Sequence, residues 1–313
     1  MGGMETTRRE FAAGLAVAAL PSVALAAPSA ALPPMLAERQ AEIDAVKSAD
    51  YSALRDTTPG SSAAKNIQAT LDKFPALERY DRAFDKVFCE MRDTKVSGAP
   101  AVWYVYNMGI VVKTQKALFT VDLCHRQAER LAPLLDFALV THNHGDHVTR
   151  PFYHAMDKVQ HKTVVSNFAD NYGAHFAGGL GGYTRSPKEF VMKGVRIRTS
   201  CSDHNSYLVD FTMPFEIEID GWTLYHTGDS ANVAKLEPSC RPDVWVVHPY
   251  CGVKVKDGVA KFHPGKTVVA HLQEMGHAKG RARWTYADGL RAVAACEACG
   301  GAAQMPLWGD RIV

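Results

Sequence analysis

Thr141-His142-Asn143-His144-Gly145-Asp146-His147 is the stretch of sequence that decides the fold. The apolar run at residues 134–140 precedes it directly, and this short continuous run predicts a buried strand. Where that strand ends, His142 and His144 stand two residues apart, so an extended chain presents both imidazoles on the same side. We expect the last two residues of the stretch to lie in a turn, with His147 opening the helix that follows.

Four side chains of this stretch have the chemistry of metal ligands: His142, His144, Asp146 and His147. Imidazole nitrogens and carboxylate oxygens are the donors that Zn²⁺ and related divalent ions accept. The alternative is a polar surface turn that happens to be rich in histidine. The spacing favours a metal site, and so does the position at the end of a strand, where ligands of α/β proteins usually bind.

Further polar side chains follow other expected strands. The alternating residues 195–199 predict a strand that leads through a polar turn to His204. Two alternating segments on either side of Asp220-Gly221 indicate a hairpin, and the second of them runs into Thr227-Gly228-Asp229.

The pattern of apolar residues predicts a mixed α/β chain. We expect helices over residues 35–47, 63–73, 77–91 and 287–295. We expect strands over residues 101–106, 109–113, 117–121, 134–140, 163–165, 195–199, 215–219, 222–226, 243–247 and 267–270.

The pattern His142-x-His144-x-Asp146-His147 resembles the signature of the metallo-β-lactamase superfamily. The later His204 and Asp229 resemble the third histidine and the metal-bridging aspartate of that superfamily. The resemblance covers about residues 98–280 and implies an αββα sandwich with two metals at one edge. A hairpin followed by Gly-Asp is most similar to the branch that contains ascorbate-6-phosphate lactonase and the N-acyl phosphatidylethanolamine phospholipase D.

The resemblance also implies which residues hold two divalent ions, with Zn²⁺ expected and Mn²⁺ or iron as alternatives. The expected ligands are His142, His144 and His204 for the first ion, Asp146, His147 and His271 for the second, and Asp229 between the two. A hydroxide shared by the ions would attack the substrate, and Asp146 would orient it and move a proton. Asp146 and Asp229 are therefore the expected catalytic residues. Asp122 would orient a metal histidine, and its alternative role is to cap the loop at the end of a strand.

The presence of Asp229 narrows the expected substrate. In the true β-lactamases of the superfamily, a cysteine or a serine stands near that place. The resemblance therefore implies hydrolysis of a lactone, thioester or phosphodiester bond in a small molecule. The alternative from another functional class is a secreted metal-binding or sensing module that does not turn over a substrate.

Four histidines compete for the last ligand position: His248, His263, His271 and His277. We expect His271, because it directly follows the β-branched run 266–270, as the closing histidine of the superfamily follows a strand. His277 lies one short turn further on, three residues after Glu274, and remains the alternative. His248 follows a strand that usually contributes no ligand, and His263 precedes a strand.

Length and composition suit one globular domain with an appendage: the chain has 313 residues, 47% of them hydrophobic, and a net charge of +2. We expect a helical segment over residues 27–97 that packs on a metallo-β-lactamase-fold domain over residues 98–313. The near-zero charge and the absence of a basic run argue against nucleic acid as a partner. After the N-terminus, no apolar stretch is long enough to span a bilayer.

The seven cysteines are scattered and do not resemble a disulfide scaffold. We expect Cys296-Glu297-Ala298-Cys299 to form a local disulfide or to have no role, because a redox pair needs a helix N-terminus and this pair follows a helix.

Residues 1–26 resemble a twin-arginine signal peptide, which directs proteins to the Tat export machinery. Arg8-Arg9 precedes Phe11, an alanine-rich apolar stretch follows, and Ala24-Leu25-Ala26 forms a small-residue cleavage site. The expected location is therefore periplasmic or secreted.

Replacing Arg8 and Arg9 with lysine should trap a full-length precursor inside the cell, because the twin-arginine pair is the feature that the export route reads. Cell fractionation and the mass of the protein in each fraction measure this. Mature protein that reaches the periplasm in unchanged amount would show that the interpretation is wrong.

Overall fold

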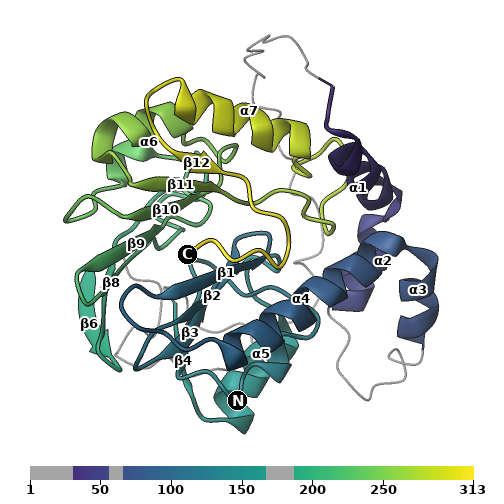
Figure 1. The fold of residues 1–313 in the computed structure, drawn as a ribbon, viewed down its shortest axis with the longest axis horizontal. Coiled ribbons are helices and arrows are strands. Elements are labelled where there is room, and N and C mark those ends of the chain that lie inside the picture. The colour runs from purple at the N-terminus through teal and green to yellow at the C-terminus, as the bar shows by residue number, and fades with distance from the viewer. Residues whose placement is uncertain (1–30, 56–65, 167–186) are drawn as a thin grey trace, which may run out of the picture. The chain divides into compact units, whose positions relative to one another are not determined.

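Two β-sheets lie in the middle of the fold in the computed structural model of this chain, which describes residues 31–55, 66–166 and 187–313 (Figure 1). Their strand orders are β1-β2-β3-β4-β5 and β12-β11-β10-β9-β8-β7-β6. The strands of the first sheet are β1 Ala101–Tyr106, β2 Gly109–Lys113, β3 Leu118–Val121, β4 Phe137–Leu139 and β5 Thr163–Val165. The strands of the second are β6 Lys188–Met192, β7 Val195–Thr199, β8 Phe215–Ile219, β9 Trp222–His226, β10 Val244–Val247, β11 Lys266–Val269 and β12 Ala303–Gln304.

The two sheets pack face to face through alternate residues of their strands. In β7, Val195 and Ile197 are buried in the core between the sheets, whereas Arg196 is exposed. The facing residues of the first sheet include Phe119 and Phe137, whose rings stack at 4.6 Å. Period-two alternation predicted β7 because only one of its faces is fully buried.

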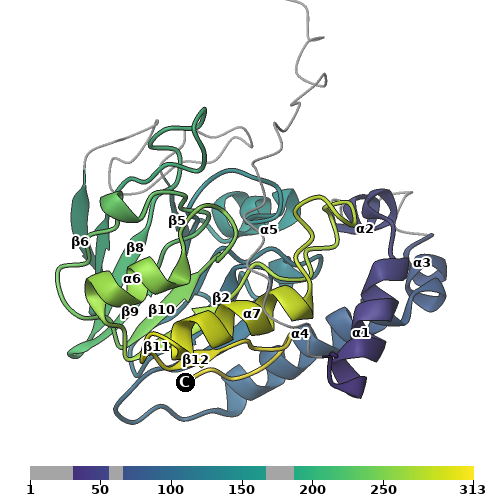
Figure 2. The ribbon, with the colours of Figure 1, turned by 90° about the horizontal axis from the view of Figure 1, so that it is seen from above.

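Helices cover the outer face of each sheet. The helices beside the first sheet are α1 Pro34–Ala45, α2 Ser48–Arg55, α3 Ile67–Lys73, α4 Pro75–Asp93 and α5 Arg150–His154. Helices α6 Val255–Phe262 and α7 Tyr286–Glu297 pack on the second sheet (Figure 2). Gly258 of α6 lies so close to the Trp245 ring that an added Cβ would come within 2.3 Å of it. These layers form the αββα sandwich that the sequence predicted.

Several predicted bounds are wrong in detail. Only Phe137–Leu139 of the predicted strand 134–140 is extended, because Pro133 and Leu134 belong to turns and Leu134 is exposed. His147 does not open a helix: α5 begins at Arg150, and Thr149 caps it by accepting a hydrogen bond from the Phe152 backbone N–H. The described residues also contain two α-helices and two strands that the sequence analysis did not predict: α2, α6, β6 and β12.

Residues Leu32–Val313 form one compact unit. The described helices of the segment 27–97 share a hydrophobic cluster with β1 and β4. As domain boundaries, 27–97 and 98–313 remain a prediction. The signal at residues 1–26 lies outside the described residues. Within the described part of the chain, no helix combines the length and the apolar character that a membrane crossing requires.

The topology places several strand ends at one edge. Strands β3, β4 and β5 run parallel in the first sheet, and β9, β10, β11 and β12 run parallel in the second. Parallel strands deliver the loops after their carboxyl ends to the same edge, which is where α/β folds usually place their ligands. The loops that follow β3, β4, β9 and β11 carry Asp122, the histidine-rich stretch, Asp229 and His271.

Arg283 ties α1 to the loop that follows β11. Its buried guanidinium donates hydrogen bonds to four backbone carbonyl groups, those of Ile43, Val46, Met275 and His277. The first two carbonyls lie at the end of α1 and the other two in the loop that begins at His271. The helical segment therefore supports one side of the edge where the polar side chains gather.

Arg283→Met should lower the free energy of unfolding of metal-free protein by about 3 kcal/mol, because four buried carbonyls lose a charged donor. Arg281→Met is the matched control, since Arg281 is exposed on the same loop, and it should change stability by less than about 0.5 kcal/mol. Urea unfolding measures both variants. Equal midpoints for the two would contradict the supporting role of Arg283.

Candidate metal centre

The seven predicted ligands come together at the edge described above. Their donor atoms form two groups, and within each group all donor atoms lie within 4.8 Å of one another. The first group is His142, His144 and His204, and the second is Asp146, His147, Asp229 and His271. The structure thus brings the seven residues together from four separate loops.

Asp229 faces both groups. Its Oδ1 lies 3.2 Å from His147 Nε2, and its Oδ2 lies 3.4 Å from His271 Nε2. The same Oδ2 lies 3.5 Å from His204 Nε2 and 4.0 Å from His142 Nε2. A single buried carboxylate therefore contacts imidazoles of both sets, which is the position that a bridging ligand requires.

Asp122 fixes the orientation of the histidine-rich loop. One carboxylate oxygen accepts the Thr141 backbone N–H at 2.7 Å. The other accepts the Thr141 hydroxyl at 2.7 Å and the His147 Nδ1–H at 2.9 Å. When His147 is neutral, its one proton stays on Nδ1, and Nε2 then offers a lone pair to the cluster. Asp122 therefore lies where the resemblance placed an orienting residue.

Gly228 allows the loop before Asp229 to pass close to Thr141. Its φ is +51°, and an added Cβ would lie 2.5 Å from the Thr141 hydroxyl oxygen. The close approach to Thr141 excludes a larger residue at this position, and the positive φ also favours glycine.

The electrostatics of the cluster require positive charge. Burial disfavours the Asp229 carboxylate, but His271 and His147 outweigh burial and hold the pKa of Asp229 well below its usual value. Burial likewise opposes protonation of His271, yet Asp229 and Asp146 raise the pKa of His271 to about 10. By contrast, burial and the neighbouring His204 lower the pKa of His144 to about 4. In the absence of a cation, protons on the second group balance its carboxylates.

Four buried polar atoms of the cluster residues have no hydrogen-bond partner among the described residues: His147 Nε2, His204 Nε2, His271 Nδ1 and Asp229 Oδ1. Buried polar atoms are rarely left without a partner, so these atoms indicate a missing group. Once the two imidazole Nε2 atoms have lost their protons, they and the carboxylate oxygen form a ligand set that fits a divalent cation. Cations would replace the protons on the second group, so metal binding should release protons.

The closing loop places His271, and not His277, in the second group. His271 Nε2 lies 3.1 Å from Asp146 Oδ2, whereas His277 Nδ1 lies 3.0 Å from Glu274 Oε2. His248 is also close, since its ring stacks on that of His271 at 3.9 Å, but it belongs to neither group.

Asn107 is a supporting residue that the sequence analysis missed. It lies in the turn between β1 and β2, and its side-chain amide donates to the Asp146 carbonyl oxygen at 2.8 Å. Its own carbonyl oxygen accepts the His271 N–H at 2.8 Å. It thus joins two loops of the second group. Its only signal in the sequence is a turn between two strands.

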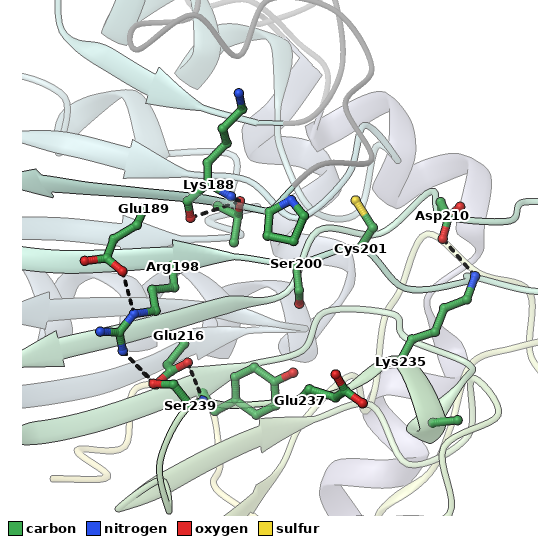
Figure 3. A pocket seen from close by; sticks show the side chains of 14 residues that line it. Lys188, Glu189, Arg198, Ser200, Cys201, Asp210, Glu216, Lys235, Glu237 and Ser239 are labelled. Carbon is green, nitrogen blue, oxygen red and sulfur yellow. Dashed lines mark hydrogen bonds and ion pairs between the residues drawn. The ribbon is translucent and has the colours of Figure 1, made fainter.

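Ion pairs hold the loop that carries His204. Lys235 Nζ lies 2.6 Å from Asp203 Oδ1. It also lies 2.8 Å from Asp210 Oδ1, a pair that Figure 3 shows. Asn232 also donates to Asp203, at 2.9 Å. The segment just after Asp229 therefore anchors both ends of the His204 loop.

A polar pocket of about 600 Å³ lies on the other side of these ion pairs (Figure 3). Strands β6 and β7 form one wall, and its charged side chains pair with one another, as Arg198 does with Glu189 and Glu216. None of the seven cluster residues lines this pocket. We therefore assign the chemistry to the cluster and not to this pocket.

Three solved structures share this fold at low sequence identity. Igni18, a metallo hydrolase from the archaeon Ignicoccus hospitalis KIN4/I, matches with a TM-score of 0.51 and 16% identity, over 68% of this chain and 98% of that chain. The metallo-β-lactamase fold protein YhfI from Bacillus subtilis and a possible metal-dependent hydrolase from Veillonella parvula DSM 2008 each match with a TM-score of 0.50 and 14% identity, over the same shares of both chains. No family model and no curated protein matches the sequence. The chain has the metallo-β-lactamase fold.

His271→Ala should reduce the metal content of metal-replete protein from two equivalents to about one, because it removes a ligand of the second group only. His277→Ala is the control and should keep both equivalents. Elemental analysis after gel filtration measures the content. A His271→Ala protein with both ions, beside a His277→Ala protein that has lost one, would move the assignment to His277.

Proposed function

We propose that this protein is an exported, dinuclear metal-dependent hydrolase that cleaves an ester-like bond in a small molecule. The observation that carries the proposal is the position of Asp229, whose carboxylate lies within 4.0 Å of imidazole nitrogens from both ligand sets. A structural zinc site is closed by four ligands. The shared carboxylate and the six ligand residues around it are more than a single ion needs, and they suit two ions.

The residues present fit two divalent ions, with Zn²⁺ expected from the histidine-rich ligands and Mn²⁺ or iron as alternatives. When bound, such ions supply a nucleophile from water at neutral pH and polarise the carbonyl or phosphoryl oxygen of the substrate. His142, His144 and His204 would hold one ion, and Asp229 would contact both. Asp146, His147 and His271 would hold the other ion.

Asp146 is the residue best placed to move a proton. Its Oδ2 already has two hydrogen-bond partners: His271 Nε2 lies 3.1 Å from it, and the Asn107 amide nitrogen lies 3.4 Å from it. The backbone carbonyl of Asp146 is fixed by Asn107 as well. With the loop held in this way, Oδ1 can accept a proton from the attacking water and return it to the leaving group.

The resemblance of the sequence supports the class of bond. A hairpin followed by Gly228-Asp229 is similar to the branch that contains ascorbate-6-phosphate lactonase and the N-acyl phosphatidylethanolamine phospholipase D. Lactones, thioesters and phosphodiesters each present an oxygen that a cation can polarise and a leaving group that needs a proton. We propose export by the Tat route because Arg8-Arg9 resembles the twin-arginine pair and residues 24–26 resemble a small-residue cleavage site.

Asp229→Asn tests the shared carboxylate. The substitution preserves the shape of the side chain but removes its charge, so both ions should bind more weakly. We expect hydrolysis to fall at least about 100-fold, because a lost ligand should cost at least as much as a lost supporting residue. The unfolding midpoint of the metal-free variant controls for damage to the fold.

The substrate assay uses a panel of lactones, thioesters and phosphodiesters. Activity that disappears on chelation and returns with Zn²⁺ or Mn²⁺ would support a metal-dependent hydrolase. An Asp229→Asn protein that keeps both ions and full activity would contradict the proposed centre. Metal-loaded wild-type protein with no turnover on any member of the panel would favour a metal-binding module instead.

A further inference from the structure

Cys251 lies beside the metal centre, although neither the sequence pattern nor the resemblance assigns it a role. It follows β10 by four residues and is half-buried. Its thiol faces the backbone carbonyl oxygens of Asp229 at 3.0 Å and of His204 at 3.3 Å. These two residues are ligands of the proposed centre, so the thiol is fixed at the place where their loops meet.

The sulfur is close to the donor atoms of the same two residues. Cys251 Sγ, a ring nitrogen of His204 and a carboxylate oxygen of Asp229 all lie within 4.8 Å of one another. His204 belongs to the first group of ligands, and Asp229 contacts both groups. The thiol therefore lies at the junction of the His204 and Asp229 loops.

A second observation indicates that a cation belongs at this junction. His204 Nε2 and Asp229 Oδ1 are both buried, and neither has a hydrogen-bond partner among the described residues. The Asp229 side chain is only 6% exposed. An imidazole nitrogen that can lose its proton, a buried carboxylate and a thiol together form a set of nitrogen, oxygen and sulfur ligands, which is a set that Zn²⁺ accepts.

We propose that Cys251 is a further ligand of the metal centre, on the edge formed by His204 and Asp229, and that its sulfur favours Zn²⁺ over Mn²⁺ and Mg²⁺. The inference rests on the proposed dinuclear centre and specifies its donor set. Thiolate ligands select thiophilic ions, whereas Mn²⁺ and Mg²⁺ prefer oxygen. When the ion binds, the S–H bond breaks, a sulfur–metal bond forms, and the proton passes to water.

The competing explanation is that the thiol only links two loops by hydrogen bonding. Cys251→Ser separates the two roles, because a hydroxyl can still donate to the carbonyl oxygens but is a poor ligand for a thiophilic ion. Cys201 provides a matched control, since it is also half-buried and lies in the segment that leads to His204, yet it belongs to no group of candidate ligands.

The experiment loads wild-type, Cys251→Ser and Cys201→Ser proteins with Co²⁺ and records their absorption spectra. A thiolate bound to Co²⁺ gives a charge-transfer band in the near ultraviolet. We expect the band in the wild-type and Cys201→Ser proteins and its loss in Cys251→Ser. In competition titrations, the preference of Cys251→Ser for Zn²⁺ over Mn²⁺ should fall at least about 10-fold.

Two outcomes would overturn the assignment of Cys251. Wild-type protein with two bound Co²⁺ ions and no band would leave the dinuclear centre intact and remove the thiolate from it. A Cys251→Ser protein that keeps the band and the metal preference would do the same. A wild-type protein that binds no Co²⁺, Zn²⁺ or Mn²⁺ would overturn the centre itself, and the Cys251 proposal with it.

Discussion

The buried carboxylate of Asp229 is the constraint on which this structure depends. It lies among four imidazoles that come from three further loops, and its Oδ1 accepts no hydrogen bond from the described residues. A buried charge of this kind costs several kcal/mol unless nearby positive charge compensates it. In the metal-free state, protons on His147 and His271 can provide that charge. Divalent ions would compensate the negative charge of Asp229 more completely than protons do. We therefore interpret the cluster as a metal centre.

The fold stabilises this cluster because residues outside the ligand set hold its loops in place. Parallel strands bring the loop ends to one edge, and each loop is then held by a group that is not itself a proposed ligand. Asp122 holds the histidine-rich loop, Lys235 holds the His204 loop, and Arg283 holds the closing loop against α1. Ligands held in this way lose little conformational freedom when an ion binds, so the site is organised in advance of binding.

The sequence predicts what is local and misses what depends on contacts between distant segments. Strand β7 could be predicted because its single buried face imposes alternation of apolar and polar residues. The histidine-rich stretch could be recognised because its ligands lie within six residues of one another. Strand β6 was missed because it is an edge strand with mostly exposed residues and no buried face to impose a pattern. Asn107 and Cys251 reach the site only through the packing of other loops. The spacing of residues along the sequence does not indicate such contacts.

The number of ions bound to wild-type protein tests the dinuclear centre most directly, because the Asp229 carboxylate can join two ions only if both are bound. Native mass spectrometry of protein equilibrated with Zn²⁺ counts the ions on the folded chain without reference to any substrate. We expect a dominant species with two zinc ions, and removal of zinc by a chelator should return the mass to that of the free chain. A species that saturates at one ion, or that binds none, would contradict the dinuclear centre.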